Sequence, residues 1–482
     1  MKFLGLLSLA SLAVATKTPP SSLDTKSSKS IKDVAGTLAF DTMTYYRGNV
    51  SSVPKDMGDL QDPYYWWVAG ALWGIMLDYY HLTGDYSYND VVIQALLAPT
   101  NLGTNHDYVP TEHADEEGND DLFFWGQAVL SAAERNFPQP NRNLPSWLQL
   151  SINVFDSLAS RWDPTTCGGG LRWQIYSNNP NGMNYKNTVT NGGFFQLAAR
   201  LARITGEQKY LDWANKVWDW SWQYEFIDHN NYHVYDGADI RDNCQKKSTS
   251  TYTYTAGIYL YGAAVLANYT GKPEWADRSK RLVEGTAWFF HPDSKPGLIM
   301  YEGACEPVNK CGADASTHKG YLARFMYLAA QMQPSLEGYV HDHLLPTTKA
   351  AVQTCVGGKS GRECGLRWWM SGFDGNPGLG QQMCALEAVQ GLLLSDAPAP
   401  LQGKDVKVVR DTDWAAMAKD KVTIKSTPTS TTTSTSSETG TGTSSEQSAK
   451  PSKSEGAADH FQADLVLASF SVGSILLFLG LA

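Results

Sequence analysis

The sequence has little positive charge and few residues arranged as metal ligands. Among its 482 residues, 39 Lys and Arg are outnumbered by 49 Asp and Glu, and the resulting net charge of −10 argues against a nucleic-acid-binding protein. There are 10 His and 7 Cys, but no Cys-x-x-Cys pair and no His-rich stretch with the spacing of a zinc site. We therefore expect no metal, no cofactor and no nucleic-acid partner.

The N-terminus has the pattern of an export signal. Residues 3–14 are apolar, follow Lys2 and end in small residues, which is typical of a secretory signal peptide and too short for a membrane span. We predict that residues 1–15 are removed and that residues 16–32 form a loose polar segment. The sequons at Asn49 and Asn268 agree with secretion, because this motif accepts N-linked glycans in exported proteins.

The seven cysteines would then lie in an oxidising compartment, where an odd number predicts up to three disulfides and one free thiol. Cys305 with Cys311, and Cys355 with Cys364, bracket short loops that a disulfide could close. The sequence leaves the connectivity open.

The composition changes near the C-terminus. Residues 425–451 are almost all Ser, Thr and Gly, a composition that cannot bury a core and is typical of an O-glycosylated stalk. We predict a linker and stalk over residues 401–456.

The last residues have the pattern of a lipid-anchor signal. Residues 465–482 carry no charge and follow a short polar spacer and small residues, as in a GPI-anchor signal. A tail-anchored transmembrane helix is the alternative, but no basic cluster follows the apolar tail. We predict attachment at Gly456, or else at Ser454, removal of residues 457–482, and a place on the outer leaflet of the plasma membrane.

Between residues 33 and 400 the composition is globular, with apolar residues at helical spacing. Gly84, Gly206 and Gly271 lie in three similar motifs, each after an apolar helical run. Glycine is favoured where a helix ends in the left-handed conformation, so each motif predicts the turn of a helical hairpin. The glycines are 122 and 65 residues apart, which fits about six hairpins of roughly 62 residues. We predict an all-α (α/α)6 toroid, with an open α-solenoid as the alternative.

Two adjacent carboxylates stand at the predicted start of a helix. Asn119 is the predicted N-cap, so Asp120 and Asp121 fall in the first turn, ahead of apolar residues such as Leu122 and Trp125. Two like charges this close cannot both ionise cheaply, so one pKa is expected to rise while the other stays low. A proton donor beside a carboxylate nucleophile is what a retaining glycosidase needs. Two adjacent aspartates also occur by chance, so the motif alone does not define a site.

Together with five further motifs, this pair resembles the fungal members of glycoside hydrolase family 76, endo-α-1,6-mannanases with an (α/α)6 fold. The resemblance spans nearly the whole globular domain. With its signal peptide, stalk and GPI tail, the chain is similar to the branch that acts in cell-wall biogenesis on the mannose core of GPI anchors. The five further motifs are residues 64–74, 169–173, 190–193, 252–257 and 318–320.

The resemblance implies that Asp120 is the nucleophile and Asp121 the general acid/base. Tryptophans could offer ring faces to sugars, although core packing is their commoner role. The acidic run 112–117 lacks the pattern of a calcium loop, and we interpret it as a solvated loop. The residues predicted to bind substrate are Trp66, Trp67, Trp125, Asn191, Asp236, Asp239, Tyr254 and Lys319.

The resemblance further implies a monomeric retaining endo-α-1,6-mannosidase or transglycosidase in the cell wall. Its substrate would be mannan or a GPI-core glycan, and wall β-glucan is the candidate acceptor. Two alternatives belong to other classes: a non-catalytic mannan-binding wall protein, and a metal-dependent α-mannosidase on a similar toroid. If paired carboxylates do the chemistry, activity is expected to be bell-shaped with pH and to have an acidic optimum.

Overall fold

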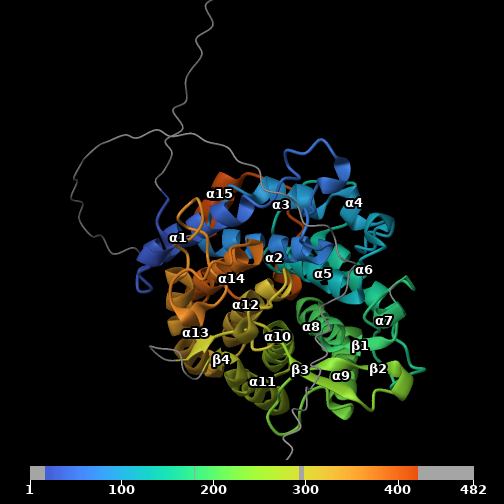
Figure 1. Ribbon diagram of the computed structural model, residues 1–482. Helices are drawn as coiled ribbons and strands as arrows, with labels where there is room; N and C mark the ends of the chain where they lie inside the picture. The colour runs from blue at the N-terminus through green and yellow to red at the C-terminus, as the bar shows by residue number, and fades with distance from the viewer. Residues whose placement is uncertain (1–16, 179, 292–297, 422–482) are drawn as a thin grey trace, which may run out of the picture.

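The helices of this chain form a closed ring (Figure 1). The computed structural model describes residues 17–178, 180–291 and 298–421. Each inner helix contacts the next, and α14 contacts α2, which closes the ring. The inner helices are α2 (Trp66–Thr83), α5 (Asn119–Glu134), α8 (Thr188–Thr205), α10 (Thr253–Thr270), α12 (His318–Met332) and α14 (Leu379–Gln390).

An outer helix packs against each inner helix. In five hairpins the outer helix follows its inner helix in sequence. The sixth hairpin joins the two ends of the domain, because α1 packs on α14. The predicted (α/α)6 toroid of six hairpins is confirmed, and the open solenoid is excluded. The outer helices are α1 (Ser28–Met43), α3 (Asn89–Leu96), α6 (Trp147–Ser160), α9 (Gln208–Gln223), α11 (Pro273–Gly285) and α13 (Glu337–Gln353); the shorter helices are α4 (Pro99–Leu102), α7 (Pro180–Met183) and α15 (Trp414–Lys421).

Three inner helices end at the glycines that indicated the repeat. Gly84, Gly206 and Gly271 cap α2, α8 and α10 with φ angles of 78°, 75° and 64°. A Cβ at Gly206 or Gly271 would meet no atom within 4 Å, so the backbone conformation, and not space, is what glycine provides there. The predicted hairpin turns are confirmed.

Short strands lie at the end of the ring where the inner helices begin. β1 (Tyr185–Asn187), β2 (Tyr235–Asp239) and β3 (Lys247–Thr251) form an antiparallel sheet in that order, and β4 (Phe290–His291) pairs with β5 (Ile299–Met300). β1 leads directly into α8, and β3 shortly precedes α10. The sheet therefore stands beside the N-terminal ends of two inner helices.

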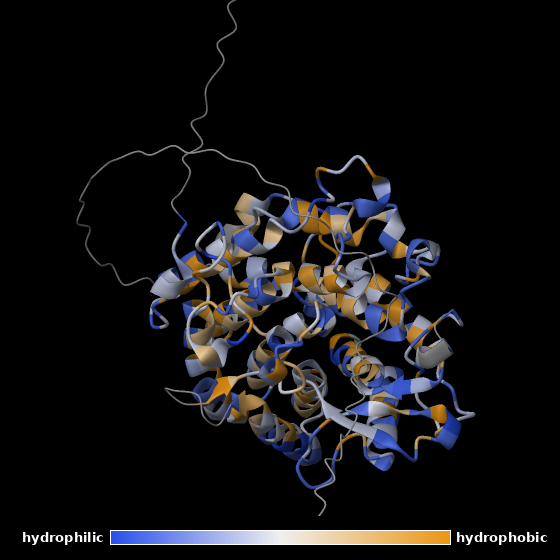
Figure 2. Ribbon diagram, in the orientation of Figure 1, coloured by the Kyte–Doolittle hydropathy of each residue, from blue (hydrophilic) through white to orange (hydrophobic). Residues whose placement is uncertain are grey.

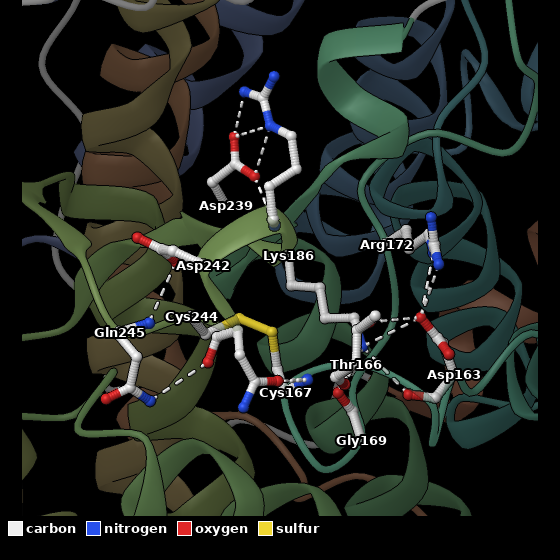
Figure 3. The surroundings of a disulfide bond; sticks show 12 residues. Asp163, Thr166, Cys167, Gly169, Arg172, Lys186, Asp239, Asp242, Cys244 and Gln245 are labelled. Carbon is white, nitrogen blue, oxygen red and sulfur yellow. Dashed lines mark hydrogen bonds and ion pairs between the residues drawn. A yellow bond between two sulfur atoms is a disulfide. The ribbon is translucent and has the colours of Figure 1, made fainter.

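A disulfide fixes the loops around this sheet. Cys167 and Cys244 join the loop after α6 to the loop after β2 (Figure 3). Beside them, Lys186 of β1 is fully buried, and its Nζ lies 2.6 Å from the Gly169 carbonyl oxygen. Three disulfides and one free cysteine were predicted, and the described residues confirm them: the other pairs are Cys305–Cys311 and Cys355–Cys364, and Cys384 is buried and free.

The centre of the ring is apolar (Figure 2) but also contains a buried ion-pair network. Asp78 of α2 pairs with Arg324 of α12 at 2.6 Å and with Arg135 at the end of α5. Glu134 of α5 accepts from Arg200 of α8 at 2.7 Å. These side chains are nearly inaccessible to water, so each charge depends on its partner. The network links helices from opposite parts of the ring.

The domain is longer at both ends than we predicted. Ile31 is buried, and α1 already begins at Ser28 with Ser27 as its cap, so residues 17–32 are not the loose segment that was expected. At the other end Trp414 packs against Tyr80 and Phe137, with ring centroids 5.6 and 5.4 Å apart. The linker therefore does not begin at residue 401, because this apolar side chain returns the chain to the core.

The predicted signal peptide, the stalk beyond residue 421 and the GPI signal lie outside the described residues. Within the described residues, no helix combines the length and the apolar character needed to cross a bilayer.

Candidate active site

The aspartate pair occupies the first turn of α5. The cap is Gly118, one residue earlier than the predicted Asn119, and Asp121 Oδ2 accepts a 2.6 Å hydrogen bond from the Gly118 N–H. Asn119 instead ties the helix to a neighbouring loop, because its N–H donates to the Trp173 carbonyl oxygen at 2.8 Å. Two hydrogen bonds thus fix the backbone just before the aspartate pair.

Both aspartates line a cavity of about 340 Å³ at the end of the ring where the inner helices begin. No Lys or Arg is among the described residues that line it. Its walls combine aromatic rings with acidic groups, a lining suited to a neutral polyhydroxylated ligand or one with a positive charge. The carboxylates are Asp115, Glu116, Asp120, Asp121, Asp236 and Asp314, and the rings belong to Tyr65, Trp66, Trp67, Phe124, Trp173, Tyr185, Tyr252, Tyr254 and His318.

Burial raises the pKa of both members of the pair. Desolvation raises the pKa of Asp120 to about 7, although backbone N–H groups and Trp173 partly oppose it. Desolvation and then the charge of Asp120 raise the pKa of Asp121 well above its ordinary value. The expectation that one pKa stays low was wrong, because the first turn is buried and not solvated.

Of the predicted tryptophans, Trp67 lines the cavity and also forms a hydrogen bond with one of the cavity's carboxylates. Its Nε1 donates to Asp314 Oδ1 at 3.2 Å, and its ring packs 4.5 Å from that of Phe124. Trp66 touches the cavity edge but is 1% exposed and stacks on Trp125 at 4.9 Å. Trp125 is fully buried. The prediction that Trp66 and Trp125 offer ring faces to sugars is corrected, since helical spacing directs both rings into the core.

Tyr254 lies in the cavity wall, stacked on His318 at 3.9 Å. His318 Nδ1 is 3.6 Å from Glu302 Oε2, and this buried carboxylate also accepts from the Thr253 N–H at 3.0 Å. Glu302 therefore fixes the start of α10 and lies beside the imidazole ring.

Of the two predicted aspartates in β2, one reaches the cavity. Asp236 lines it and accepts a 2.7 Å hydrogen bond from Tyr185 Oη. Asp239 lies outside the cavity lining and pairs with Arg241, whose Nε is 2.9 Å from Asp239 Oδ1. Asp239 is therefore corrected to a turn residue.

Asn191 and Lys319 have structural positions. The Asn191 side chain is fully buried and bridges backbone groups of Leu171 and Asn187. Lys319 is 1% exposed, with its Nζ 2.7 Å from Glu306 Oε1. Their predicted contact with substrate is corrected, because neither side chain reaches the cavity.

Sequence reasoning did not place three cavity residues, Trp173, Tyr185 and Asp314, in the site. Trp173 lies in the motif of residues 169–173, and its aromatic ring was a usable signal. The acidic run was misinterpreted as a solvated loop: Glu116 lines the cavity, and Glu117 is fully buried.

Glu117 makes stability depend on pH. Burial raises its pKa from 4.5 to about 9, and neither carboxylate oxygen has a hydrogen-bond partner in the described part of the chain. The folded state therefore holds a proton that the unfolded chain loses above its ordinary pKa, so stability falls as pH rises through this window. In the wild type this proton makes the free energy of unfolding fall by up to about 1.4 kcal/mol per pH unit. We expect Glu117→Gln to remove this dependence, which denaturant unfolding at pH 5 and pH 8 measures.

The control for this prediction is Glu112→Gln, because Glu112 is an exposed acid in the same run. An unchanged slope in Glu117→Gln would contradict the buried, protonated state of Glu117.

Both predicted glycosylation sites are exposed. Asn49 lies in a turn, whereas the Asn268 amide nitrogen donates to the Met332 carbonyl oxygen at 3.0 Å.

No group of three His, Cys, Asp or Glu side chains in the described ranges is arranged to hold a metal ion. What the site contains is a pair of carboxyls with raised pKa values at the mouth of a helical ring, lined by aromatic rings. This fold and site define a glycoside hydrolase of the helical-toroid class. The chain belongs to glycosyl hydrolase family 76, whose family model matches residues 30–404.

Relatives and solved structures agree with this assignment. The chain is 43% identical over 379 residues to the mannan endo-1,6-alpha-mannosidase DCW1 of Saccharomyces cerevisiae, covering 78% of this chain and 82% of that protein. It is also 43% identical to a putative mannan endo-1,6-alpha-mannosidase of Schizosaccharomyces pombe, C970.02, over 83% of this chain and 87% of the relative. The crystal structure of Dfg5 from Chaetomium thermophilum, in complex with glucosamine, superposes with a TM-score of 0.76 at 38% identity, over 82% of this chain and 98% of that one.

Proposed function

We propose that this enzyme cleaves α-1,6-mannosidic bonds with retention of configuration, using Asp120 as nucleophile and Asp121 as acid/base. The observation that carries this proposal is the placement of both carboxyls in one helical turn, facing one cavity. Retention requires carboxyl groups about 5–5.5 Å apart, whereas inversion requires about 6.5–9.5 Å. Adjacent residues on one turn favour the shorter separation.

The order of the two roles follows from their surroundings. Asp121, whose pKa is raised well above its ordinary value by burial and by the charge of Asp120, is the proton donor to the leaving oxygen. Burial raises the pKa of Asp120 to about 7, and its Oδ1 has no hydrogen-bond partner among the described residues. This oxygen is the one we assign to attack at the anomeric carbon. Asp121 then deprotonates the water or sugar hydroxyl that releases the product.

The acidic cavity favours a mannoside that carries a positive charge. Asp314, Asp236 and Glu116 add to the charge around the pair, and no Lys or Arg of the described chain lines the cavity to balance them. Dfg5, a relative, was crystallised with the amino sugar glucosamine. We therefore propose that the substrate is the mannose core of a GPI glycan, in which mannose is linked to an amino sugar, with mannan as the alternative.

We further propose that the protein is exported, held by a GPI anchor at the outer leaflet and active in cell-wall biogenesis. The sequence patterns at both ends support this. The glycosyl group would then pass from Asp120 to a hydroxyl of β-glucan in place of water, which breaks the bond to Asp120 and frees the enzyme. A non-catalytic binding protein would not need the pair of raised pKa values.

The test is to incubate the purified full chain with labelled α-1,6-mannooligosaccharides or a GPI-core glycan, with and without a β-glucan acceptor. Mass spectrometry follows the products. Shortened mannosides alone identify a hydrolase, and label joined to the acceptor identifies a transglycosidase. Absence of any product from all substrates would contradict the proposal.

A further inference from the structure

Trp288 is the one tryptophan of the described chain with a mostly exposed side chain. It is 55% exposed, whereas the other tryptophans are buried or partly buried. An exposed indole offers a large apolar face and one N–H donor that a ligand could cover. Trp288 lies in the short 3-10 helix Thr286–Phe289, which directly follows α11.

The ring of Trp288 forms one wall of a second cavity, of about 480 Å³. Facing it is the loop of residues 230–233, whose His233 ring centroid is 5.3 Å from that of Trp288. The amide side chains of Asn230 and Asn231, together with Arg281, add hydrogen-bonding groups to the lining. An aromatic face beside amide and guanidinium donors is a surface suited to the apolar face and the hydroxyls of a sugar ring.

The cavity is preformed. Asp228 accepts hydrogen bonds from the N–H groups of Asn230 and Asn231 at 2.8 and 3.1 Å, and so fixes the loop. Arg281 holds the loop to α11, because its Nη2 donates to the Asn230 carbonyl oxygen at 3.3 Å. A ligand would therefore bind without first ordering the loop, which favours affinity.

This second cavity lies on the same end of the ring as the active site. His233 is three residues from Asp236, the β2 residue that lines the active-site cavity, so their backbones are at most about 11 Å apart. On the other side, Phe289 accepts from the Tyr301 N–H at 2.9 Å, and the next residue, Glu302, caps α10 at the active site. One short stretch of chain, residues 233–236, therefore connects the linings of the two cavities.

We propose that the cavity at Trp288 is a distal subsite for the same type of ligand, a hexopyranose chain that extends out of the active-site cavity. The proposal rests on the proposed function for the part of the chain held at Asp120 and Asp121. Two sources share this chemistry: the far end of the mannoside that is cleaved, and the glucan acceptor.

The experiment compares the full chain with Trp288→Ala, using α-1,6-mannotriose and α-1,6-mannohexaose as substrates. We expect KM for the hexaose to rise about tenfold, with kcat and the KM for the triose unchanged, because the triose is too short to reach Trp288. Trp288→Tyr keeps a ring and should restore most of the affinity. The matched control is Tyr86→Ala, since Tyr86 is an exposed ring just after the C-terminal end of α2, on the opposite end of the domain.

Calorimetric binding of mannohexaose and of laminarihexaose to the Asp120→Asn protein, with and without Trp288→Ala, separates the sources. Weaker mannohexaose binding identifies the donor chain, and weaker laminarihexaose binding identifies the acceptor. Unchanged binding of both, with unchanged hexaose KM, would overturn the distal subsite. If the wild type cleaves no mannoside, the proposed function fails, while the binding comparison still decides the role of Trp288.

Discussion

We expect replacement of Asp120 by Asn to lower kcat for mannoside cleavage by at least about 10⁴-fold, without loss of the folded ring. The amide cannot form the glycosyl-enzyme, whereas its size and its place in the first turn of α5 are preserved. Because burial of the Asp120 carboxylate is itself unfavourable, as its raised pKa shows, the neutral amide should leave Tm unchanged or higher. Steady-state kinetics and thermal unfolding of the same preparation test both parts.

Asp121→Asn tests the partner role. We expect a loss of about 10²–10⁴ in kcat on mannosides, and a smaller loss on an aryl mannoside whose leaving group needs no proton. The fall in activity at high pH, which reports loss of the Asp121 proton, should disappear. The fall at low pH, where Asp120 becomes protonated near its pKa of about 7, should persist, so the wild-type optimum is higher than the sequence predicted.

The control for both substitutions is Asp239→Asn, because Asp239 lies outside the cavity lining. We expect this variant to keep near wild-type activity. If Asp120→Asn retained more than about a tenth of wild-type activity, Asp120 would not be the nucleophile.

The second large effect is on stability and comes from the centre of the ring. Asp78 accepts from two buried arginines, Arg135 and Arg324, so Asp78→Asn leaves two guanidinium groups without their shared counter-charge. Removal of one member of a buried ionic network costs about 3–5 kcal/mol. We expect Tm to fall by several degrees, and the fall should be visible in thermal unfolding followed by circular dichroism.

Asp33→Asn is the matched control for Asp78→Asn. Asp33 pairs with Lys29 at 2.6 Å on the exposed surface of α1, and such pairs contribute less than about 1 kcal/mol. Equal Tm values for the Asp78 and Asp33 variants would contradict a stabilising role for the buried network.

The helical ring could be predicted because its signals are local. Gly84, Gly206 and Gly271 mark helix ends through their own backbone conformation, and the spacing between them gives the repeat. The aspartate pair could likewise be placed in a first helical turn from its immediate neighbours. The error of one residue in the cap arose because glycine can cap a helix without a side chain.

The rest of the site depends on contacts between distant parts of the chain. Trp67 and Asp314 are 247 residues apart in sequence, yet they share a hydrogen bond in the cavity wall. Lys319 and Asn191 lie in motifs that resemble the family, but their side chains turn away from the cavity to satisfy buried carboxylate and backbone groups. A motif indicates that a residue is near the site, and only its partners in the fold decide whether it faces substrate.

The most direct test of the mechanism is the configuration of the first product. The full chain is mixed with α-1,6-mannotetraose, and proton NMR spectra are recorded before the new reducing end mutarotates. The α-anomer should appear first, because Asp120 forms a covalent intermediate that is displaced in a second inversion. First appearance of the β-anomer would show direct attack by water and would contradict the nucleophilic role of Asp120.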